Sequence, residues 1–261
     1  MSAAVDYPVG ASVWQELRVR SAEGLADFYA AVLGLELRLE PAGNGRATGT
    51  LSRDGAIAAG VLVDPGLPAA EIGWQVFLGT EPDLDAAVAR AVAAGAAVLR
   101  DPEPMLAPGR AVRLSDPFGA PFGLAVPAPG RAIPPTTRLG FLALVDPTNH
   151  DLDAEVAFQR ALFPDSVHDP VVPHDVCFFR DADGLALRGS FEVAEEARPF
   201  LPPHWLPWFS VADQAAAVDA AAATGGTVNT RDNTSSFGVW GVVVDPGGGV
   251  FKTLQAARPA L

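Results

Sequence analysis

The chain opens with a change from a two-residue to a helical hydrophobic period. Residues 11–19, ASVWQELRV, alternate between apolar and polar, as expected when successive side chains of a strand point to opposite faces. Residues 23–33 then repeat apolar side chains at helical spacing. The apolar face of this predicted helix is formed by Leu25, Phe28, Tyr29 and Val32.

The rest of this half predicts strands around a second helix. Residues 46–63 favour a hairpin or two short strands, and WQVFL at 74–78 favours another strand. An alanine-rich helix is expected over 84–94, ended by Gly95 as a left-handed C-cap. AVRLS and PFGLAV flank the turn DPFGA and predict a closing hairpin over 111–126.

The second half repeats this order at a nearly constant offset, which indicates a duplicated unit. Four pairs of landmarks agree within two positions: Phe28 and Phe158 (130 apart), Trp74 and Trp205 (131), Gly95 and Gly226 (131), and Asp116 and Asp245 (129). The second copy is expected to contain a strand at 138–145, a helix at 152–162, strands near 175–191, a strand at 205–211, a helix at 213–223 and a final pair over 238–254. The predicted boundaries are a first module at 1–127, a proline-rich linker at 128–137 and a second module at 138–261.

Several segments resemble one known superfamily: ADFYAAVLGLEL (26–37), AAVARAVAAGAAV (86–98), GRAVRLSDPFGAPFGL (109–124) and VVVDPGGGVF (242–251). This superfamily is the glyoxalase / bleomycin-resistance / extradiol dioxygenase (vicinal oxygen chelate) superfamily, and the resemblance spans about Val9 to Gln255. It implies an α+β fold of tandem βαβββ modules that form cupped mixed β-sheets with flanking helices. It specifies function poorly, because the superfamily includes lyases, isomerases, epimerases, ring-cleaving dioxygenases, thiol transferases and drug-sequestering proteins.

Metal-using members hold a divalent ion with His, Gln or Glu from the first, fifth and last strands, residue types that suit such ions. By the landmarks, the first module has Trp14, Trp74 and Gly123 at these positions. The second module has Gly140 or Leu144, then Trp205 or Leu206, then Lys252. None of these side chains is a metal ligand of that kind, so we expect neither a metal nor another cofactor.

The four histidines, His150, His168, His174 and His204, all lie in the second half near loops. Their spacing contains no HxH and no i, i+4 pair, which favours surface or loop roles. His174 is the one retained as a catalytic candidate, because the adjacent Asp175 carboxylate can orient its ring.

Tryptophans at the ligand positions predict an aromatic-lined pocket for a small molecule. The substrate-binding candidates are Trp14, Trp74, Trp205, Trp208, Trp240 and Arg113. The alternative for the tryptophans is that they fill a hydrophobic core. For Arg113, and for Arg110 beside it, the alternatives are pairing with an anionic ligand group or a solvated face.

Two further residues are candidates for catalysis. Glu16, two residues after Trp14, can serve as a general base; the alternatives are an ion pair with Arg18 or Arg113, or an exposed strand end. Lys252 is the only lysine of the chain and can act electrostatically or through a Schiff base. Its alternative is a side chain whose charged head lies in water. Asp116 and Asp245 are expected to cap their turns, and Cys177 to lie in the core.

The composition and net charge limit the kinds of molecule that the protein is expected to bind. Hydrophobic residues make up 49% and charged residues 19%, enough for a sizeable core, and the net charge of −13 disfavours binding to nucleic acid or an anionic membrane. The single cysteine excludes an intramolecular disulfide, and neither a leader nor a membrane-spanning run is evident. We therefore expect a soluble cytoplasmic protein, a monomer or homodimer, with a small-molecule ligand.

Three functions remain open on the sequence. The first is a metal-independent lyase, isomerase or cyclase acting on an aromatic or polyketide-like metabolite through acid–base groups. The second is a binding protein that sequesters a drug or metabolite, as the resistance members of the superfamily do. The third is a divalent-metal lyase or dioxygenase, against which the missing ligands count.

Overall fold

The computed structural model describes residues 6–99, 106, 109–171, 176–184, 186–193, 195, 198, 203–235 and 237–257. The first half forms β1 (Ser12–Val19), α1 (Leu25–Leu33), β2 (Glu36–Gly43), β3 (Arg46–Arg53), β4 (Ala56–Val63), the short 3-10 helix η1 (Ala69–Glu71), β5 (Gly73–Gly79), α2 (Leu84–Ala93), β6 (Ala97–Val98), β7 (Gly109–Ser115) and β8 (Pro121–Pro127). The second half forms β9 (Leu142–Asn149), α3 (Leu152–Leu162), β10 (Val167–Val171), β11 (Val176–Arg180), β12 (Ala186–Glu192), β13 (His204–Ser210), α4 (Gln214–Ala223), β14 (Thr227–Ser235), β15 (Gly238–Val244) and β16 (Val250–Ala256).

Each half contributes one eight-stranded mixed sheet, and the two sheets have the same strand order. The first runs β2-β3-β4-β1-β5-β8-β7-β6 and the second β10-β11-β12-β9-β13-β16-β15-β14. The pairs β1–β4 and β5–β8 are parallel, and β2–β3, β3–β4 and β7–β8 are antiparallel. Each half therefore contains two successive βαβββ motifs, which confirms the predicted α+β fold of tandem modules. The module boundaries at 127 and 138 stay a prediction.

The predicted helices and central strands are present, and the missed strands share one property. β2, β6, β10 and β14 are the four outer strands of the two sheets. The side chains of β14 are exposed or partly exposed, and this strand lacks the apolar alternation on which the prediction relied. β2 does alternate Leu37 and Leu39 with charged residues, and its omission was an error of the prediction. The expected strand at 138–145 was placed too early, because Gly140 precedes β9 and adopts a left-handed conformation (φ 83°).

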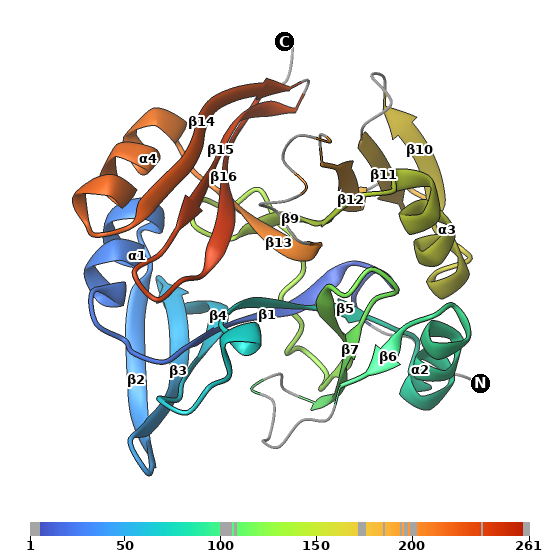
Figure 1. Cartoon of the computed structure of the whole chain (residues 1–261), viewed down its shortest axis with the longest axis horizontal. Helices are drawn as coiled ribbons and strands as arrows, with labels where there is room; N and C mark the ends of the chain where they lie inside the picture. Colours follow the sequence, from blue (N-terminus) through green and yellow to red (C-terminus); the bar gives the residue numbers. More distant parts are fainter. Residues whose placement is uncertain are drawn as a thin grey trace. The chain divides into compact units, whose positions relative to one another are not determined.

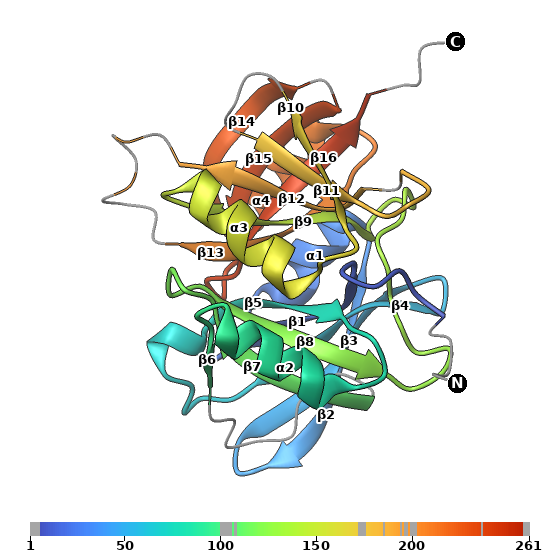
Figure 2. The same ribbon diagram turned by 90° about the vertical axis from the view of Figure 1, so that its right-hand side faces the viewer.

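The chain divides into two compact units, each of which takes segments from both halves. Unit 1 comprises Met1–Trp14, Gln75–Pro135 and Leu144–Leu206; unit 2 comprises Gln15–Trp74, Thr136–Ala143 and Pro207–Leu261. Within unit 2, α1 and α4 pack side by side (Figure 1). Within unit 1, α2 and α3 do the same (Figure 2).

One large core cluster belongs to unit 2 and joins the apolar face of α1 to strands from both halves of the sequence. Its aromatic residues include Phe28, Tyr29, Trp74, Phe209 and Phe251. The helix face predicted for α1 is therefore buried, as its spacing indicated. None of the helices in the described part of the chain is long and apolar enough to cross a membrane.

Candidate ligand-binding site

Lys252 and Trp208 face each other across two neighbouring strands of unit 2. They are register partners in the parallel pair β13–β16. One adjacent residue on each strand, Phe209 after Trp208 and Phe251 before Lys252, belongs to the hydrophobic core. Because side chains alternate along a strand, Trp208 and Lys252 point to the opposite face of the sheet, away from that core.

The ammonium group of Lys252 lies against two indole rings. Its Nζ is 4.4 Å from the ring centroid of Trp208 and 5.4 Å from that of Trp240 on β15. Trp208 also contacts Trp240 (centroids 5.3 Å apart) and Phe237 (5.6 Å). We call Trp208, Phe237, Trp240 and Lys252 the aromatic–lysine cluster. It brings together three of the residues predicted for the site.

Two members of the cluster are buried and two are partly exposed. Trp208 is fully buried and Lys252 is only 5% exposed, whereas Phe237 and Trp240 are partly exposed. The alternative that Lys252 holds its charged head in water is therefore wrong. Its side chain stands on a sheet face whose neighbours are indoles, and cation–π attraction favours that position.

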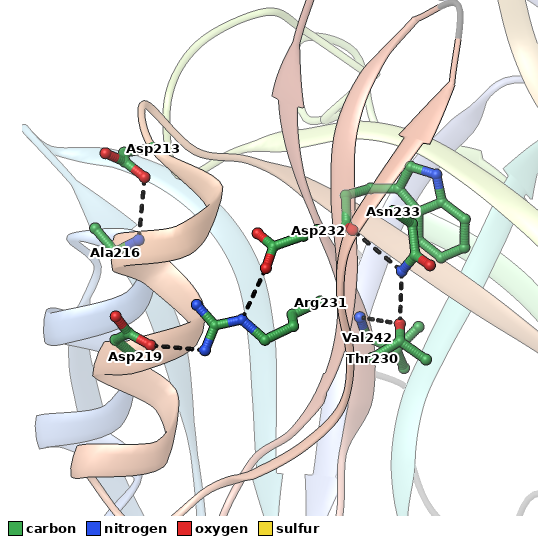
Figure 3. Close-up of polar contacts among 9 residues, drawn as sticks. Asp213, Ala216, Asp219, Thr230, Arg231, Asp232, Asn233 and Val242 are labelled. Atoms are coloured by element: carbon green, nitrogen blue, oxygen red, sulfur yellow. Dashed lines mark hydrogen bonds and ion pairs between the residues drawn. The ribbon is translucent and has the colours of Figure 1, made fainter.

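The strand that carries Trp240 is braced by the outer strand β14 (Figure 3). Asn233 donates from Nδ2 to the Trp240 carbonyl oxygen (3.3 Å) and to Thr230 Oγ1 (2.9 Å). The backbone N–H of Val242 also donates to Thr230 Oγ1 (3.2 Å). These bonds replace regular pairing at the two places where the β14–β15 register shifts.

A second set of contacts ties the same bulge to α4. Asp232 adopts a left-handed conformation (φ 56°), and Arg231 beside it pairs with Asp232 and with Asp219 of α4, each at 3.0 Å (Figure 3). These ion pairs are exposed, so each contributes little to stability. Their effect is to fix where the outer strand lies.

Unit 2 also contains a group of three polar side chains, Glu16, Arg18 and Glu71. Glu16 Oε1 lies 3.2 Å from Arg18 Nε, and Arg18 Nη1 donates to Glu71 Oε2 (2.7 Å). Glu16 and Arg18 are both buried, and Glu71 is partly exposed. The alternative of an exposed strand end is therefore wrong, and the ion pair with Arg18 is present. A role for Glu16 as general base stays a prediction.

Two of the remaining tryptophans have neighbours of different kinds. Trp74 packs against Tyr29 (6.1 Å), Phe209 (5.0 Å) and Phe251 (6.3 Å), which are core residues of unit 2. Trp205 stacks on Phe122 (5.6 Å) in unit 1. Trp74 thus fills the hydrophobic core, which was the alternative to a role in ligand binding. Ligand contact by Trp74 or Trp205 stays a prediction.

The other predicted site residues are dispersed. Trp14 on β1 is buried. Arg113 on β7 is only 3% exposed, so the alternative of a solvated face is wrong for it, whereas Arg110 is exposed and pairs with Asp85 (3.1 Å). His174 lies outside the described residues.

Both predicted turn aspartates cap their turns. Asp116 Oδ1 accepts from the N–H groups of Phe118 and Ala120, and Asp245 Oδ1 accepts from those of Gly247 and Gly249. Burial raises the pKa of both carboxyls, while these hydrogen bonds act in the opposite direction. Cys177 is buried in a small core cluster, as expected.

The positions that hold metal in the superfamily do not fit a divalent ion here. A side chain at position 123 would overlap the ring of Phe77, which covers Gly123. The ammonium of Lys252 would repel a cation, and Trp74, three residues before Phe77 on β5, points to the other face of the strand. Among the residues whose placement is described, no three His, Cys, Asp or Glu side chains come together as a metal site.

Comparison with known proteins agrees with this architecture. Residues 15–125 match the model of the glyoxalase-like domain family. The "Anthracycline biosynthesis protein DauV" of Streptomyces sp. (strain C5) is 28% identical over 97% of both chains, and the "Putative glyoxylase CFP32" of Mycobacterium tuberculosis is 27% identical over 97% of both.

Solved structures support the same fold. A Mn(II)-bound glyoxalase from Novosphingobium aromaticivorans superposes with a TM-score of 0.61 at 17% identity, covering 95% of this chain and 82% of its own. Homoprotocatechuate 2,3-dioxygenase from Brevibacterium fuscum gives 0.63 at 15% identity, covering 98% and 85%. Residues 15–125 thus match the glyoxalase-like domain family, and the chain as a whole shares the fold of these glyoxalase and dioxygenase structures.

The sequence reasoning missed Phe237, Thr230 and Asn233. Phe237 lies just before β15, and the two polar residues lie on β14, an outer strand that was not predicted. An aromatic next to a glycine at the start of a strand was the only signal for Phe237, and the polar pair carried none.

Proposed function

We propose that the protein binds a planar aromatic metabolite of polyketide type on the aromatic–lysine cluster and acts on it without a bound metal. The observation that carries this proposal is the position of Lys252 against Trp208 and Trp240 on the face of the sheet opposite the core. Partly exposed indole and phenyl rings offer surfaces on which a flat ligand can stack. An adjacent ammonium selects ligands that carry a carbonyl, enol or phenolate oxygen.

The names of two full-length relatives support this ligand class. DauV and the "Anthracycline biosynthesis protein DnrV" of Streptomyces peucetius, which is 26% identical, are described as proteins of anthracycline biosynthesis. Anthracyclines contain fused planar rings with ketone and phenol oxygens, which are the groups that the cluster is suited to bind.

The chemistry that this arrangement favours is removal of a proton next to a ligand carbonyl. The proton passes to a general base, and the electron pair moves onto the carbonyl oxygen. Lys252 stabilises the resulting oxyanion, an effect that is strongest where water is excluded. Return of the proton to another atom gives an isomerase or cyclase, and expulsion of a leaving group gives a lyase.

Tryptophan fluorescence titration with anthraquinone and tetracyclic polyketide aglycones tests the proposal. Wild type is expected to show saturable quenching that is lost or strongly weakened in Lys252→Met. Arg38→Met also removes one positive charge, but at a side chain that is 72% exposed on β2, and it serves as the matched control. Absence of quenching across the panel, or equal weakening in both variants, contradicts the proposal. Binding with no converted product after long incubation indicates a sequestering protein instead of an enzyme.

A further inference from the structure

The face of α3 that is turned toward the sheet in unit 1 carries a buried polar network. Glu155 and Gln159 lie one helical turn apart and are 0% and 1% exposed. Gln159 donates from Nε2 to Glu155 Oε1 (2.9 Å), and its own Oε1 accepts from Arg188 Nε on β12. Arg188 is also 0% exposed, and its Nη1 donates to the Gly10 carbonyl oxygen (3.1 Å).

This network is not fully satisfied by the residues around it. The Arg188 guanidinium stacks on Phe163 (4.5 Å) and Phe179 (4.4 Å). In the described part of the chain, Glu155 Oε2 and Arg188 Nη2 have no hydrogen-bond partner. Enclosing such groups costs several kcal/mol relative to apolar side chains of similar size, so stability does not explain their presence.

The internal repeat shows what the fold accepts at the same positions. An offset of 130 aligns Glu155 with Leu25 and Gln159 with Tyr29, and the Ala-Gly and Arg-Gly pairs of β4 and β12 align Arg188 with Ala59. Leu25, Tyr29 and Ala59 are all fully buried members of the core cluster of unit 2. The architecture therefore tolerates a mainly apolar set here, and the second half of the sequence departs from it at three contacting positions.

Burial controls the protonation of the network. Desolvation and, next, the nearby charge of Asp116 in the β7–β8 turn together raise the pKa of Glu155 to about 8, against the opposing effects of Gln159 and Arg188. Desolvation lowers the pKa of Arg188 to about 9, opposed by Glu155 and by Cys177 on β11. From α2, Arg90 reaches the Leu162 carbonyl at the end of α3 and pairs with Glu81. At neutral pH Glu155 is therefore the neutral acid.

We propose that the Glu155–Gln159–Arg188 network is a proton-linked switch that holds α3 against the second sheet while Glu155 carries its proton and loosens α3 when that proton leaves. A deprotonated Glu155 would place a second buried carboxylate near Asp116 in a site that offers its Oε2 no donor among the described residues. Separation of α3 from the sheet lets water solvate that charge. The switch lies in unit 1 and uses none of the residues of the ligand site proposed in unit 2.

Hydrogen–deuterium exchange of the full-length protein tests this, with α1 as an internal reference. After correction for the intrinsic pH dependence of exchange, protection of the α3 peptide (152–162) is expected to fall at least about tenfold more than that of α1 (25–33) between pH 6 and 8.5. The reference is suitable because burial raises the pKa of Tyr29, the buried hydroxyl of α1, well above its usual value, so this group keeps its proton in that range. Parallel changes in α1 and α3 of the wild type overturn the proposal without any variant.

Two variants identify the titrating group. Glu155→Gln keeps the shape and the bond to Gln159 but cannot ionise, so α3 should lose the extra pH dependence. The triple variant Glu155→Leu, Gln159→Tyr, Arg188→Ala copies the residues at the equivalent positions of the first half and should do the same. If α3 of a folded Glu155→Gln protein still loosens between pH 6 and 8.5, the switch is not Glu155 and the proposal fails.

Discussion

The hydroxyl of Tyr29 on α1 donates a 2.5 Å hydrogen bond to Oδ2 of Asp245 in the β15–β16 turn. Asp245 thereby does two things, since its Oδ1 caps the turn through the N–H groups of Gly247 (2.8 Å) and Gly249 (2.9 Å). The equivalent Asp116 in unit 1 caps its own turn and accepts a bond from Trp205 Nε1 (3.1 Å). In each unit, a turn aspartate from one half of the sequence is thus bonded to an aromatic residue from the other half.

Tyr29→Phe should destabilise the protein by about 1–3 kcal/mol, because it leaves a buried carboxylate oxygen without its donor. The bond from Tyr29 lowers the pKa of Asp245 against the effect of burial, so that pKa should rise in the variant. A carboxyl whose folded pKa rises loses stability as pH increases through that value. The deficit should therefore be larger at pH 7 than at pH 4, as measured by urea denaturation.

Tyr7→Phe is the matched control for this measurement. Tyr7 is also buried, but its hydroxyl donates to the backbone carbonyl of Thr80 (2.8 Å), which does not titrate. Its loss should cost a similar or smaller free energy that does not change between the two pH values. An equal pH dependence in both variants would show that Asp245 is not the group responsible.

Global stability should fall as pH rises from about 4.5 to 8. Glu155 has an ordinary pKa of 4.5 when unfolded and one of about 8 when folded, so the folded state holds the proton more tightly across this window. The stabilisation is complete below the unfolded pKa and is lost as pH passes the folded value. Glu155→Gln should flatten this part of the curve and be more stable than wild type at pH 8.5, on the order of a few kcal/mol.

Much of the fold was predictable because the two halves of the sequence repeat the same pattern of elements. Helices α1 to α4 and the central strands bury one apolar face, so their periodicity reports their structure directly. The outer strand β14 does not. β14 is mostly exposed and is shaped by the side-chain bonds of Thr230 and Asn233 and by a left-handed Asp232. Such contacts depend on neighbours in space, and no local pattern encodes them.

The residue types of the candidate site were predictable from the sequence, but which of these residues contact one another was not. Spacing placed Lys252 and tryptophans on the expected strands, yet it could not tell that Trp74 packs with Tyr29 while Trp208 packs with Lys252. Both rings lie on central strands, and the face to which each points depends on the local register. The buried network of α3 could have been noticed in the sequence, because Glu155 aligns with Leu25, which lies on the apolar face of the equivalent helix.

Substitutions of Lys252 separate its two candidate roles. Lys252→Arg keeps a cation against Trp208 and Trp240 but cannot form a Schiff base. We expect an electrostatic role, in which the arginine variant binds the aromatic ligand within about tenfold of wild type and Lys252→Met binds about tenfold to a hundredfold more weakly. Because Lys252 is the only lysine, reduction with cyanoborohydride in the presence of a ketone ligand also locates any imine. A stable adduct on Lys252 would favour the covalent role.

Removal of divalent metal should leave ligand binding unchanged. Gly123 is covered by Phe77, and Lys252 places a positive charge at the corresponding position of the second half. Dialysis against EDTA followed by fluorescence titration is expected to reproduce the affinity of untreated protein, and added Mn²⁺ should not raise it. A stoichiometric metal in the purified protein together with loss of binding on chelation would refute a metal-free site.

Thr230→Val should weaken ligand binding without touching the aromatic–lysine cluster itself. The change preserves side-chain shape but removes the oxygen that accepts from Val242 N–H and from Asn233, so the bulge that braces the Trp240 strand loses two bonds. Each bond contributes about 0.5–1.5 kcal/mol, and we expect a threefold to tenfold loss of affinity with faster amide exchange at Val242. Thr227→Val, an exposed threonine at the start of the same strand, is the control and should bind as wild type does. Equal affinity of both variants would mean that the contacts of Trp240 with Trp208 and Lys252 hold it in place without the bonds of Thr230.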